Sequence, residues 1–472
     1  MNVAGRWRTV VPSHLPRPIW VLAAGQVVDS FGSGLVFPLT TLYVVHVLGR
    51  DLTWAGTVLS LHSLLATVMV GIGGRLADRL GRKPLLLTSL VSSGVVSFLI
   101  GLWPVATAYA VLMVLFGMTV SLYRPASQAL VSDLAPGRER QVFSLLYMAL
   151  NLGVALGAAA GGSLVAAWSY RAIYWADALT FFLSAVLVAW GVPDTFRKRL
   201  LTRRRHGAAL PGTGNAAGNS PVTSLGEQRR TTGRTAPTGG PERVREPATA
   251  PAFGAVGQRG PRSRRLDDLY QSGLLSVVIL GLASLGLWFV YAQLQTVLPV
   301  TMSGLGFSEA AYGMLWSLNA ILVVVLTPVL STLADRRGWS LSGLLQSSAV
   351  VHAAGFAILL LAGDRPVYGW FVLAIVVITV GEVLQAISFS ATVARIAPED
   401  LRGTYQGLAG MLTSLGWVAG PLLGGAIADA WGTTALWAVT VVVPLCALLG
   451  YRMADAVGTT RSGAPRHASM KA

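Results

Sequence analysis

Two carboxyl side chains lie inside long apolar segments of this chain, where ionisable groups are rare. Asp29 lies in the segment 19–47, and Glu382 lies in the segment 366–394. An ionisable side chain at the centre of a bilayer costs at least about 2.5–3.5 kcal/mol on insertion scales, so each one is a candidate functional group. Burial away from a fixed cation favours the neutral form of a carboxyl group. A carboxyl group that alternates between its two forms can exchange a proton for a cation, and we expect Asp29 and Glu382 to do so.

Other polar side chains are candidates to line the same substrate path as these two carboxyl groups. Gln385 follows Glu382 by three residues, and Gln295 follows Tyr291 by four, so each pair shares one face of a helix. His62 lies midway along another apolar segment and can titrate, although a hydrogen-bonded packing role is the alternative for it. A face of aromatic, amide and acidic groups suits a cationic or amphipathic organic molecule. Contacts between helices are the alternative use of such amides.

A short charged motif recurs in the chain. Residues 74–84, with the sequence GRLADRLGRKP, carry five charges between two apolar segments. The sequence Asp-Arg-Arg-Gly at 335–338 repeats part of this motif at an offset of 257 residues. Glycine rows also repeat, at an offset of 263 residues: Gly153, Gly157, Gly161 and Gly162 correspond to Gly416, Gly420, Gly424 and Gly425. The repetition predicts two halves of similar structure.

The elements that position these residues are predicted to be membrane-spanning helices. The chain has 472 residues and only 12% charged residues, against about 25% in a soluble domain. Apolar runs of about 20 residues cross a hydrocarbon core as helices, because lipid cannot satisfy the backbone. Twelve such segments are predicted: 19–47, 53–73, 84–103, 105–123, 141–167, 172–192, 273–301, 308–331, 341–362, 366–394, 403–429 and 433–453.

The distribution of basic residues predicts the orientation. With the N-terminus inside, 33 of the 36 Lys and Arg residues are cytoplasmic, which is the positive-inside pattern. Both termini are then cytoplasmic, and the net charge of +16 requires no nucleic acid as a partner. The first apolar run is too long for a cleaved signal peptide. No other candidate metal ligand accompanies the single Cys446 in the sequence, and we expect no metal.

The chain is predicted to divide into four parts. Residues 1–194 form one six-helix bundle and 266–455 form another, as in transporters built from repeats. Between them, residues 195–265 are rich in Gly, Pro, Ala, Thr and Arg without an apolar period, which is typical of a disordered linker. Its fifteen Lys and Arg residues are suited to anionic lipid headgroups. Residues 456–472 are a cytoplasmic tail.

The motif at 74–84 resembles the signature of the major facilitator superfamily. That signature, Gly-x-x-x-Asp-Arg-x-Gly-Arg-Lys/Arg, lies between helices two and three, and the matching residues are Gly74, Asp78, Arg79, Gly81, Arg82 and Lys83. The resemblance covers both halves. It implies an all-α membrane protein with twelve transmembrane helices in two six-helix halves, in which helices one, four, seven and ten line a central cavity. Asp29 and Glu382 are then on the substrate path, one in each half.

The resemblance also implies a conformational latch at these motifs. In the family, the corresponding Asp and Arg help to close the cytoplasmic side when the carrier opens outward. Asp78 is then expected to face the start of helix eleven, and Arg82 to pair with Asp133. The second copy keeps Asp335, Arg336 and Gly338, but has Ser331 and Trp339 in place of the first Gly and of the Arg that matches Arg82. A weaker second latch is expected.

Two further departures concern the helices near the cavity. Gly420-Pro421-Leu-Leu-Gly424-Gly425 has the form that resembles the antiporter motif of helix five, but it stands in helix eleven, while helix five has Ala158 in place of the Pro. Packing of small residues explains both glycine rows. Arg124 is expected near the cytoplasmic end of its helix, outside a proton relay.

These residues predict a secondary active transporter of the cell membrane that works by alternating access. The leading hypothesis is proton-coupled export of cationic or amphipathic small molecules, as in drug:proton antiporters, by a monomer in the lipid bilayer. A carrier for a polar metabolite, such as a sugar, organic acid or peptide, is the alternative. A third hypothesis is a non-transporting sensor on the same scaffold. No enzymatic activity and no cofactor are expected, since no nucleophile–base pair, phosphate loop or metal cluster occurs.

Overall fold

The computed structural model of the protein describes residues 15–136, 138–194, 273–398 and 401–462. Eleven helical segments in this part are long and apolar enough to cross a membrane. The last of them, α17 (Arg402–Ser462), consists of two helices that meet at Gly432. Gly432 has φ of 83° and ψ of 164°, a conformation that glycine adopts without a steric penalty. With this bend the described chain has twelve crossings, which confirms the predicted number.

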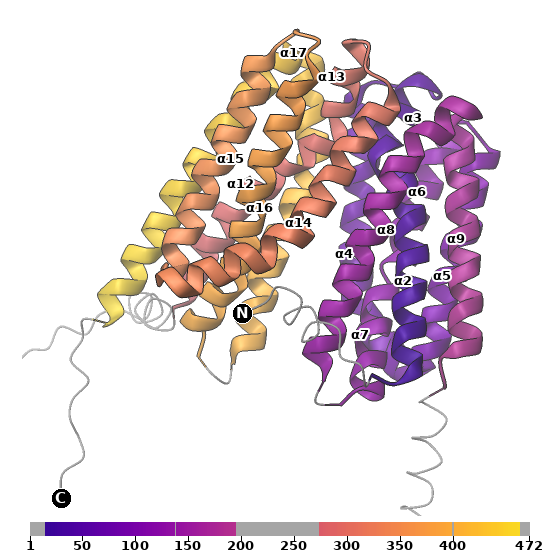
Figure 1. Ribbon diagram of the computed structural model, residues 1–472, viewed down its shortest axis with the longest axis horizontal. Coiled ribbons are helices and arrows are strands. Elements are labelled where there is room, and N and C mark those ends of the chain that lie inside the picture. The colour runs from indigo at the N-terminus through magenta and orange to yellow at the C-terminus, as the bar shows by residue number, and fades with distance from the viewer. Residues whose placement is uncertain (1–14, 137, 195–272, 399–400, 463–472) are drawn as a thin grey trace, which may run out of the picture.

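Each half contributes six crossings to the bundle (Figure 1). The first half consists of α2 (Arg17–Val36), the 3-10 turn η1 (Phe37–Leu39), α3 (Thr40–His46), α4 (Leu52–Leu80), α5 (Arg82–Leu102), α6 (Ala106–Val120), α7 (Tyr123–Leu134), α8 (Glu139–Ala167) and α9 (Tyr170–Gly191). The second half consists of α12 (Leu274–Thr296), α13 (Leu298–Gly304), α14 (Glu309–Arg337), α15 (Leu341–Ala362), α16 (Tyr368–Ile396) and α17. The segments α2–η1–α3, α6–α7 and α12–α13 are each one crossing with a local irregularity.

The N-terminal cap of the second crossing is repeated between the two halves, as the motifs are. Asp51 caps α4, accepting a hydrogen bond from the backbone N–H of Trp54 at 2.7 Å. Ser308, which lies 257 residues further on, caps α14 in the same way through the N–H of Ala311 at 3.2 Å. Short oxygen-bearing side chains satisfy the free N–H groups of a first turn, so both halves begin their second crossing by the same device.

Two predicted boundaries are wrong, and in both cases the helix is longer than its apolar core. α4 continues to Leu80, so the motif at 74–84 is helical up to Gly81, where φ is 94°. Its Arg, Leu and Ala residues are good helix formers and keep the helix going beyond the membrane-sized run. The fourth crossing runs to Leu134 through α7, so Arg124 lies inside it as an exposed side chain rather than near its end.

The two halves lie against each other at one end of the molecule and diverge toward the other (Figure 1). The meeting end, called here the closed end, holds the start of α4 and of α14 and the bend of α17. α8 lies along α14, and α4 lies along α17. The opposite, or open, end holds the motif at 74–84 and the end of α14. The helices of the two halves are therefore close together at the closed end and further apart at the open end.

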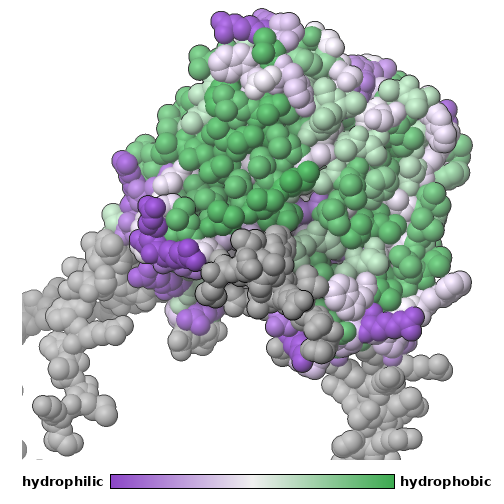
Figure 2. Space-filling model, viewed as in Figure 1, coloured by the Kyte–Doolittle hydropathy of each residue, from purple (hydrophilic) through white to green (hydrophobic). Residues whose placement is uncertain are grey.

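The surface of the bundle is apolar over most of its height (Figure 2). On the face shown, hydrophobic residues form a broad band, and hydrophilic residues gather toward the two ends. Large side chains such as Leu179 and Val325 are more than half exposed within α9 and α14. Such a band matches the hydrocarbon core of a bilayer.

The predicted division into parts is only partly covered by the described residues. The linker predicted at 195–265 lies outside them. In the second half, α17 continues to Ser462, beyond the predicted bundle boundary at residue 455.

Candidate substrate site and the contacts between the halves

Glu382 is held between three helices by polar partners. Tyr291 of α12 donates its hydroxyl to Oε2 of Glu382 at 3.0 Å, and Asn319 of α14 donates Nδ2 to the same oxygen at 2.9 Å. Nδ2 of Asn319 also lies 2.9 Å from Oγ1 of Thr379. Two donors on one oxygen stabilise the charged carboxylate and fix its direction. We call Glu382, Tyr291, Asn319 and Thr379 the Glu382 cluster.

Indole rings surround the tyrosine of this cluster. The ring centroid of Tyr291 lies 5.5 Å from that of Trp288, 5.9 Å from Trp417 and 6.3 Å from Trp316. Trp288 and Trp417 lie 5.6 Å apart. These four rings, the aromatic cluster, offer negative ring faces next to a carboxylate, a combination that attracts organic cations.

The sequence reasoning missed the three tryptophans. Trp288 precedes Tyr291 by three residues, and Trp316 precedes Asn319 by three, so helical spacing already placed these pairs on shared faces. Trp417 gave no such signal, because it comes to the site from α17. Trp316 also reaches the first half, since its ring lies 6.5 Å from that of Phe37.

The two predicted amides have different surroundings. Gln385 is buried one turn beyond Glu382, and its Nε2 has no hydrogen-bond partner in the part of the chain that the structure describes. A buried donor without a partner is costly, so Gln385 is a ready ligand for an acceptor group. Gln295 is buried on α12, where its backbone oxygen accepts a hydrogen bond from Thr41 of the first half at 3.1 Å.

Asp29 is buried in the first half, on α2. Its side chain is 8% exposed, and Oδ1 has no partner among the described residues. The structure does not group Asp29 with Glu382: α2 packs on α8 and α9, whereas α16 packs on α15 and α14. Asp29 is thus a buried acidic position of the first half, and Glu382 is a half-buried one of the second.

A second buried carboxyl group of the first half lies on α9 and was not among the leading candidates. Asp177 is fully buried and accepts a hydrogen bond from Ser97 at 2.7 Å. It approaches the α2 backbone at Gly32, where an added Cβ would lie 2.6 Å from Oδ1 of Asp177. Asp177 is therefore packed into the first half at the level of α2.

His62 lies at a helix contact. Its Nδ1 lies 2.9 Å from the backbone oxygen of Met113, so this nitrogen carries the proton and donates it. The ring stacks on Phe116 and fits against Gly117 of α6. These contacts are those of the packing alternative, and they lie between α4 and α6.

The first copy of the motif is tied into its own half. Arg82 forms an ion pair with Asp133, the partner that the resemblance implies for it. Lys83 donates Nζ to the backbone oxygens of Ala189 and Val192 at 2.7 and 2.6 Å. The side chain of Asp78 lies outside the described residues. Arg79 is exposed at the end of α4.

Gly74 lies in open space in this conformation. A Cβ added there meets nothing within 4 Å, whereas one added at Gly73 would lie 2.7 Å from Pro125 of α7. The close approach of α4 to α7 is made at Gly73, because Gly73 is the residue on the face that α4 turns toward α7. In the second copy, Asp335 and Arg336 are exposed and Gly338 ends α14 with φ of 64°.

The glycine rows are packing surfaces, as their spacing predicts. Gly153, Gly157 and Gly161 of α8 lie against the α2 backbone. In the second half, the matching contacts join α17 to α12, through Gly416, Gly420 and Gly424. An added Cβ would clash in each case, with backbone oxygens of the facing helix at Gly153, Gly157, Gly161 and Gly416, and with the side chain of Gln293 at Gly424.

Glycines also line the contact between the halves, which we call the seam. A Cβ added at Gly56 of α4 would clash with the carbonyl oxygen of Pro421. At the matching place, a Cβ at Gly313 of α14 would clash with that of Ala158. These pairs are related by the same offsets of 257 and 263 residues as the motifs. The duplicated sequence thus builds both sides of the seam alike.

Polar contacts strengthen the closed end. Oδ2 of Asp429 accepts hydrogen bonds from N and Oγ1 of Thr53, each at 2.6 Å. Tyr170 donates its hydroxyl to Glu309 at 2.6 Å, and His46 lies 3.0 Å from the same hydroxyl. Both carboxylates belong to the second half, and their donors belong to the first.

No group of three or more His, Cys, Asp or Glu side chains that could hold a metal occurs in the described residues.

Comparison with known sequences identifies the scaffold. The Major Facilitator Superfamily profile matches residues 22–421 and 347–469. The chain is 26% identical to an uncharacterized MFS-type transporter, YttB of Bacillus subtilis, over 89% of this chain and 91% of that protein. It is 24% identical to a Na(+), Li(+), K(+)/H(+) antiporter of Planococcus maritimus, covering 86% and 88%. Multidrug resistance protein MdtH of Cronobacter sakazakii is 32% identical over 37% of this chain and 44% of that protein.

Solved structures share the fold. A crystal structure of the peptide transporter POT superposes with a TM-score of 0.70 at 16% identity, covering 98% of this chain and 99% of that one. A POT family transporter in complex with 5-aminolevulinic acid gives 0.68 at 13% identity, covering 95% and 97%.

Proposed function

Because the chain belongs to the Major Facilitator Superfamily and is an integral membrane transporter, we propose that it exports cationic or amphipathic organic molecules in exchange for protons. Transport follows alternating access, in which the two halves rock about a central site. The conformation described above is closed at one end and open at the other, as one state of such a cycle.

The observation that carries this proposal is the Glu382 cluster beside the aromatic cluster. Glu382 has two uncharged donors and no Lys or Arg partner within the described residues. A cationic ligand supplies the missing positive charge, and the rings of Trp288 and Trp417 supply apolar and cation–π contact. An anionic substrate would meet the carboxylate without a compensating cation.

Proton coupling follows from competition for the same carboxyl groups. A proton bound to Glu382 removes the charge that holds the cation, and a bound cation disfavours the proton. Asp29 provides a second such group in the other half, buried and with a free oxygen. The name of the Planococcus maritimus relative supports cation–proton exchange on this scaffold, and the name of MdtH supports drug export.

We assign the open end to the cytoplasm. The motif at 74–84 and the end of α14 carry basic residues at this end, and basic residues favour the cytoplasmic side. The closed end then faces outward, both termini are cytoplasmic, and the carrier is open inward. We place it in the cell membrane as a monomer. The first motif with Asp133, and more weakly the second, then act as latches that close the cytoplasmic side in the opposite state.

A polar metabolite is the second candidate substrate. The unpartnered Nε2 of Gln385 and the amide of Asn319 can bind a carbonyl or hydroxyl group of such a substrate. Glu382 then needs no cation as its ligand. This candidate predicts uptake that does not depend on the charge of the substrate.

Transport in reconstituted vesicles tests the proposal. Purified protein in proteoliposomes with an imposed pH gradient is given tetraphenylphosphonium or ethidium, and both accumulation and dissipation of the gradient are measured. Glu382→Gln and Asp29→Asn should each abolish exchange, since the amides cannot carry a proton. Asp364→Asn, which removes an exposed carboxylate between α15 and α16, is the matched control and should exchange as the wild type does.

Exchange at the wild-type rate in both amide variants would overturn the coupling role. Uptake of a neutral sugar or dipeptide in place of the cations would favour the second candidate.

A further inference from the structure

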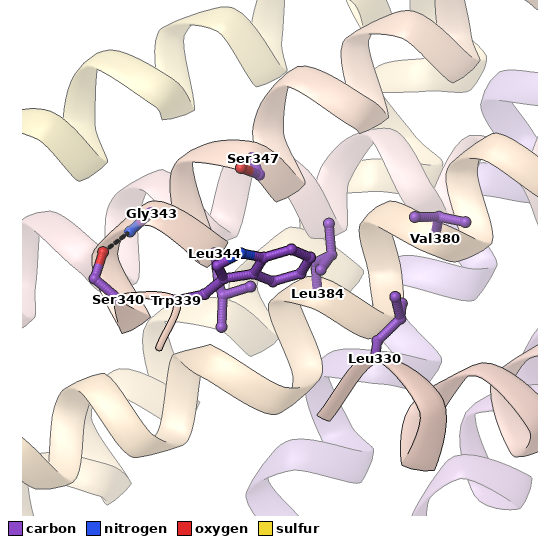
Figure 3. A pocket seen from close by; sticks show the side chains of 8 residues that line it. All are labelled: Leu330, Trp339, Ser340, Gly343, Leu344, Ser347, Val380 and Leu384. Carbon is purple, nitrogen blue, oxygen red and sulfur yellow. Dashed lines mark hydrogen bonds between the residues drawn. The ribbon is translucent and has the colours of Figure 1, made fainter. Parts of the chain in front are cut away.

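A lateral pocket lies beside the second copy of the motif (Figure 3). Its volume is about 430 Å³, within the range of small-molecule sites. Three helices of the second half meet there, and the indole of Trp339 lies across it. The lining residues are Leu330 of α14, Trp339, Ser340, Gly343, Leu344 and Ser347 at the start of α15, and Val380 and Leu384 of α16.

The same place in the first half is occupied differently. Arg82, the counterpart of Trp339, is bound by Asp133, and Lys83 is bound by backbone oxygens. In the second half, Trp339 is 43% exposed, and Ser340 turns back to cap α15 through the N–H of Gly343 at 3.0 Å. The replacement of Arg by Trp thus exchanges an internal ion pair for an apolar pocket.

Two cations remain beside this pocket. Arg336 and Arg337 form the last turn of α14 and are exposed, and neither has an ion pair within the described ranges. They end α14 at the open end of the bundle (Figure 1), and hydrophilic residues gather toward that end of the molecule (Figure 2). A Trp at this level is typical of the boundary between hydrocarbon and headgroups.

We propose that this pocket binds an anionic phospholipid, with one acyl chain against Trp339 and the phosphate at Arg336 and Arg337. An acyl chain suits the pocket because its walls are leucines, a valine and an indole, and because the adjoining medium is lipid. The guanidinium groups distinguish an anionic headgroup from a neutral one by charge. The site is independent of the transported substrate and of the direction of transport.

Occupation of the pocket bears on the substrate helix. Val380 and Leu384 lie two residues before and two residues after Glu382 on α16. They line the lipid pocket on the face of α16 opposite to the face that carries Glu382. A lipid held here connects α14, α15 and α16, the first and third of which carry Asn319 and Glu382. A lipid in the pocket is therefore placed to hold together, from the side of the open end, the helices that carry the Glu382 cluster.

Native mass spectrometry of the purified full chain tests the acyl-chain contact. The probes are phosphatidylglycerol and phosphatidylcholine with identical chains. Ser347→Trp fills the pocket, and Val350→Trp adds the same side chain on an exposed position of α15 outside the lining. We expect Ser347→Trp to lose the retained phosphatidylglycerol and Val350→Trp to keep it. Ser347→Leu repeats the test if the larger side chain impairs folding.

The headgroup contact is tested with charge-matched variants. Arg336→Gln with Arg337→Gln should weaken binding of phosphatidylglycerol roughly tenfold and that of phosphatidylcholine less, because the choline group offsets the charge of its phosphate. Arg395→Gln with Arg452→Gln removes two exposed charges from the same half and should have no effect. Equal retention of both lipids by all variants would overturn the site. Loss on filling the pocket without any effect of Arg336 and Arg337 would overturn its selectivity for anionic lipid, and with it the proposal.

Discussion

At the scale of single residues, the aromatic cluster allows recognition of a ligand's charge to be distinguished from recognition of its shape. The ring centroid of Trp288 lies within 6 Å of those of both Tyr291 and Trp417, so its ring contacts two other rings of the cluster. A cation over an indole face gains about 0.5–2 kcal/mol, depending on how far it is desolvated. A neutral molecule of the same size gains only the apolar contact.

We expect Trp288→Leu to weaken binding of tetraphenylphosphonium by roughly three- to tenfold, about 1 kcal/mol. Trp288→Phe keeps a ring and should lose less. Binding to the purified protein is measured by isothermal titration, with triphenylphosphine oxide as the neutral probe. An equal loss for the neutral and the cationic probe would show that Trp288 only packs.

The ion pair between Arg82 and Asp133 is a second residue-scale test. The two side chains are 16% and 4% exposed, so the pair is largely shielded from solvent. In a double-mutant cycle with Arg82→Gln and Asp133→Asn, we expect a coupling of roughly 1–2 kcal/mol in the free energy of unfolding. Unfolding in mixed micelles by SDS measures it. Additive effects of the two substitutions would contradict the pair.

At the scale of the elements, sequence reasoning succeeded where the information is periodic along the chain. The twelve crossings and the duplication follow from apolar length and from the offsets of the motifs, and the glycine rows pack as their spacing implies. It failed where neighbours come from different helices. The sequence placed Tyr291 and Glu382 on the same path, but not their hydrogen bond to each other or the part of Asn319 in it. The partner of His62 is a backbone oxygen of α6. The overrun of α4 was missed because an apolar run marks the membrane-spanning part of a helix and not its ends.

The seam glycines make a prediction about helix approach. Gly56 and Gly313 contact carbonyl oxygens of α17 and α8 across the seam, so any side chain there forces the halves apart. Gly313→Val should open the closed end, and Gly71→Val, at a position with open space around it, should not. In a Cys446→Ser background, Thr41→Cys is the reporter, since Thr41 is buried at the seam. We expect faster labelling by a thiol reagent with Gly313→Val. Unchanged protection would show that the seam tolerates a larger separation.

At the scale of the whole molecule, the balance between the two states depends on what each end gains by closing. At the closed end, Asp429 and Glu309 of the second half accept short hydrogen bonds from Thr53 and Tyr170 of the first. Hydrogen bonds to charged groups contribute roughly 1.5–3 kcal/mol each. They are made only while this end is closed, so their whole contribution favours the state that is closed at this end.

Glu309→Gln together with Asp429→Asn should therefore lower the ratio of closed to open molecules at this end by at least about tenfold. Asp51→Asn is the control, because it removes a charge at the same end while Asn still caps α4 and no contact between the halves is lost. Distances between spin labels at Val47→Cys and Gly304→Cys, in the Cys446→Ser background, report the separation of the halves at the closed end. A longer distance in the double variant alone is the expected result. The same distance distribution in all three proteins would mean that the apolar and glycine contacts of the seam, and not these carboxylates, hold the halves together.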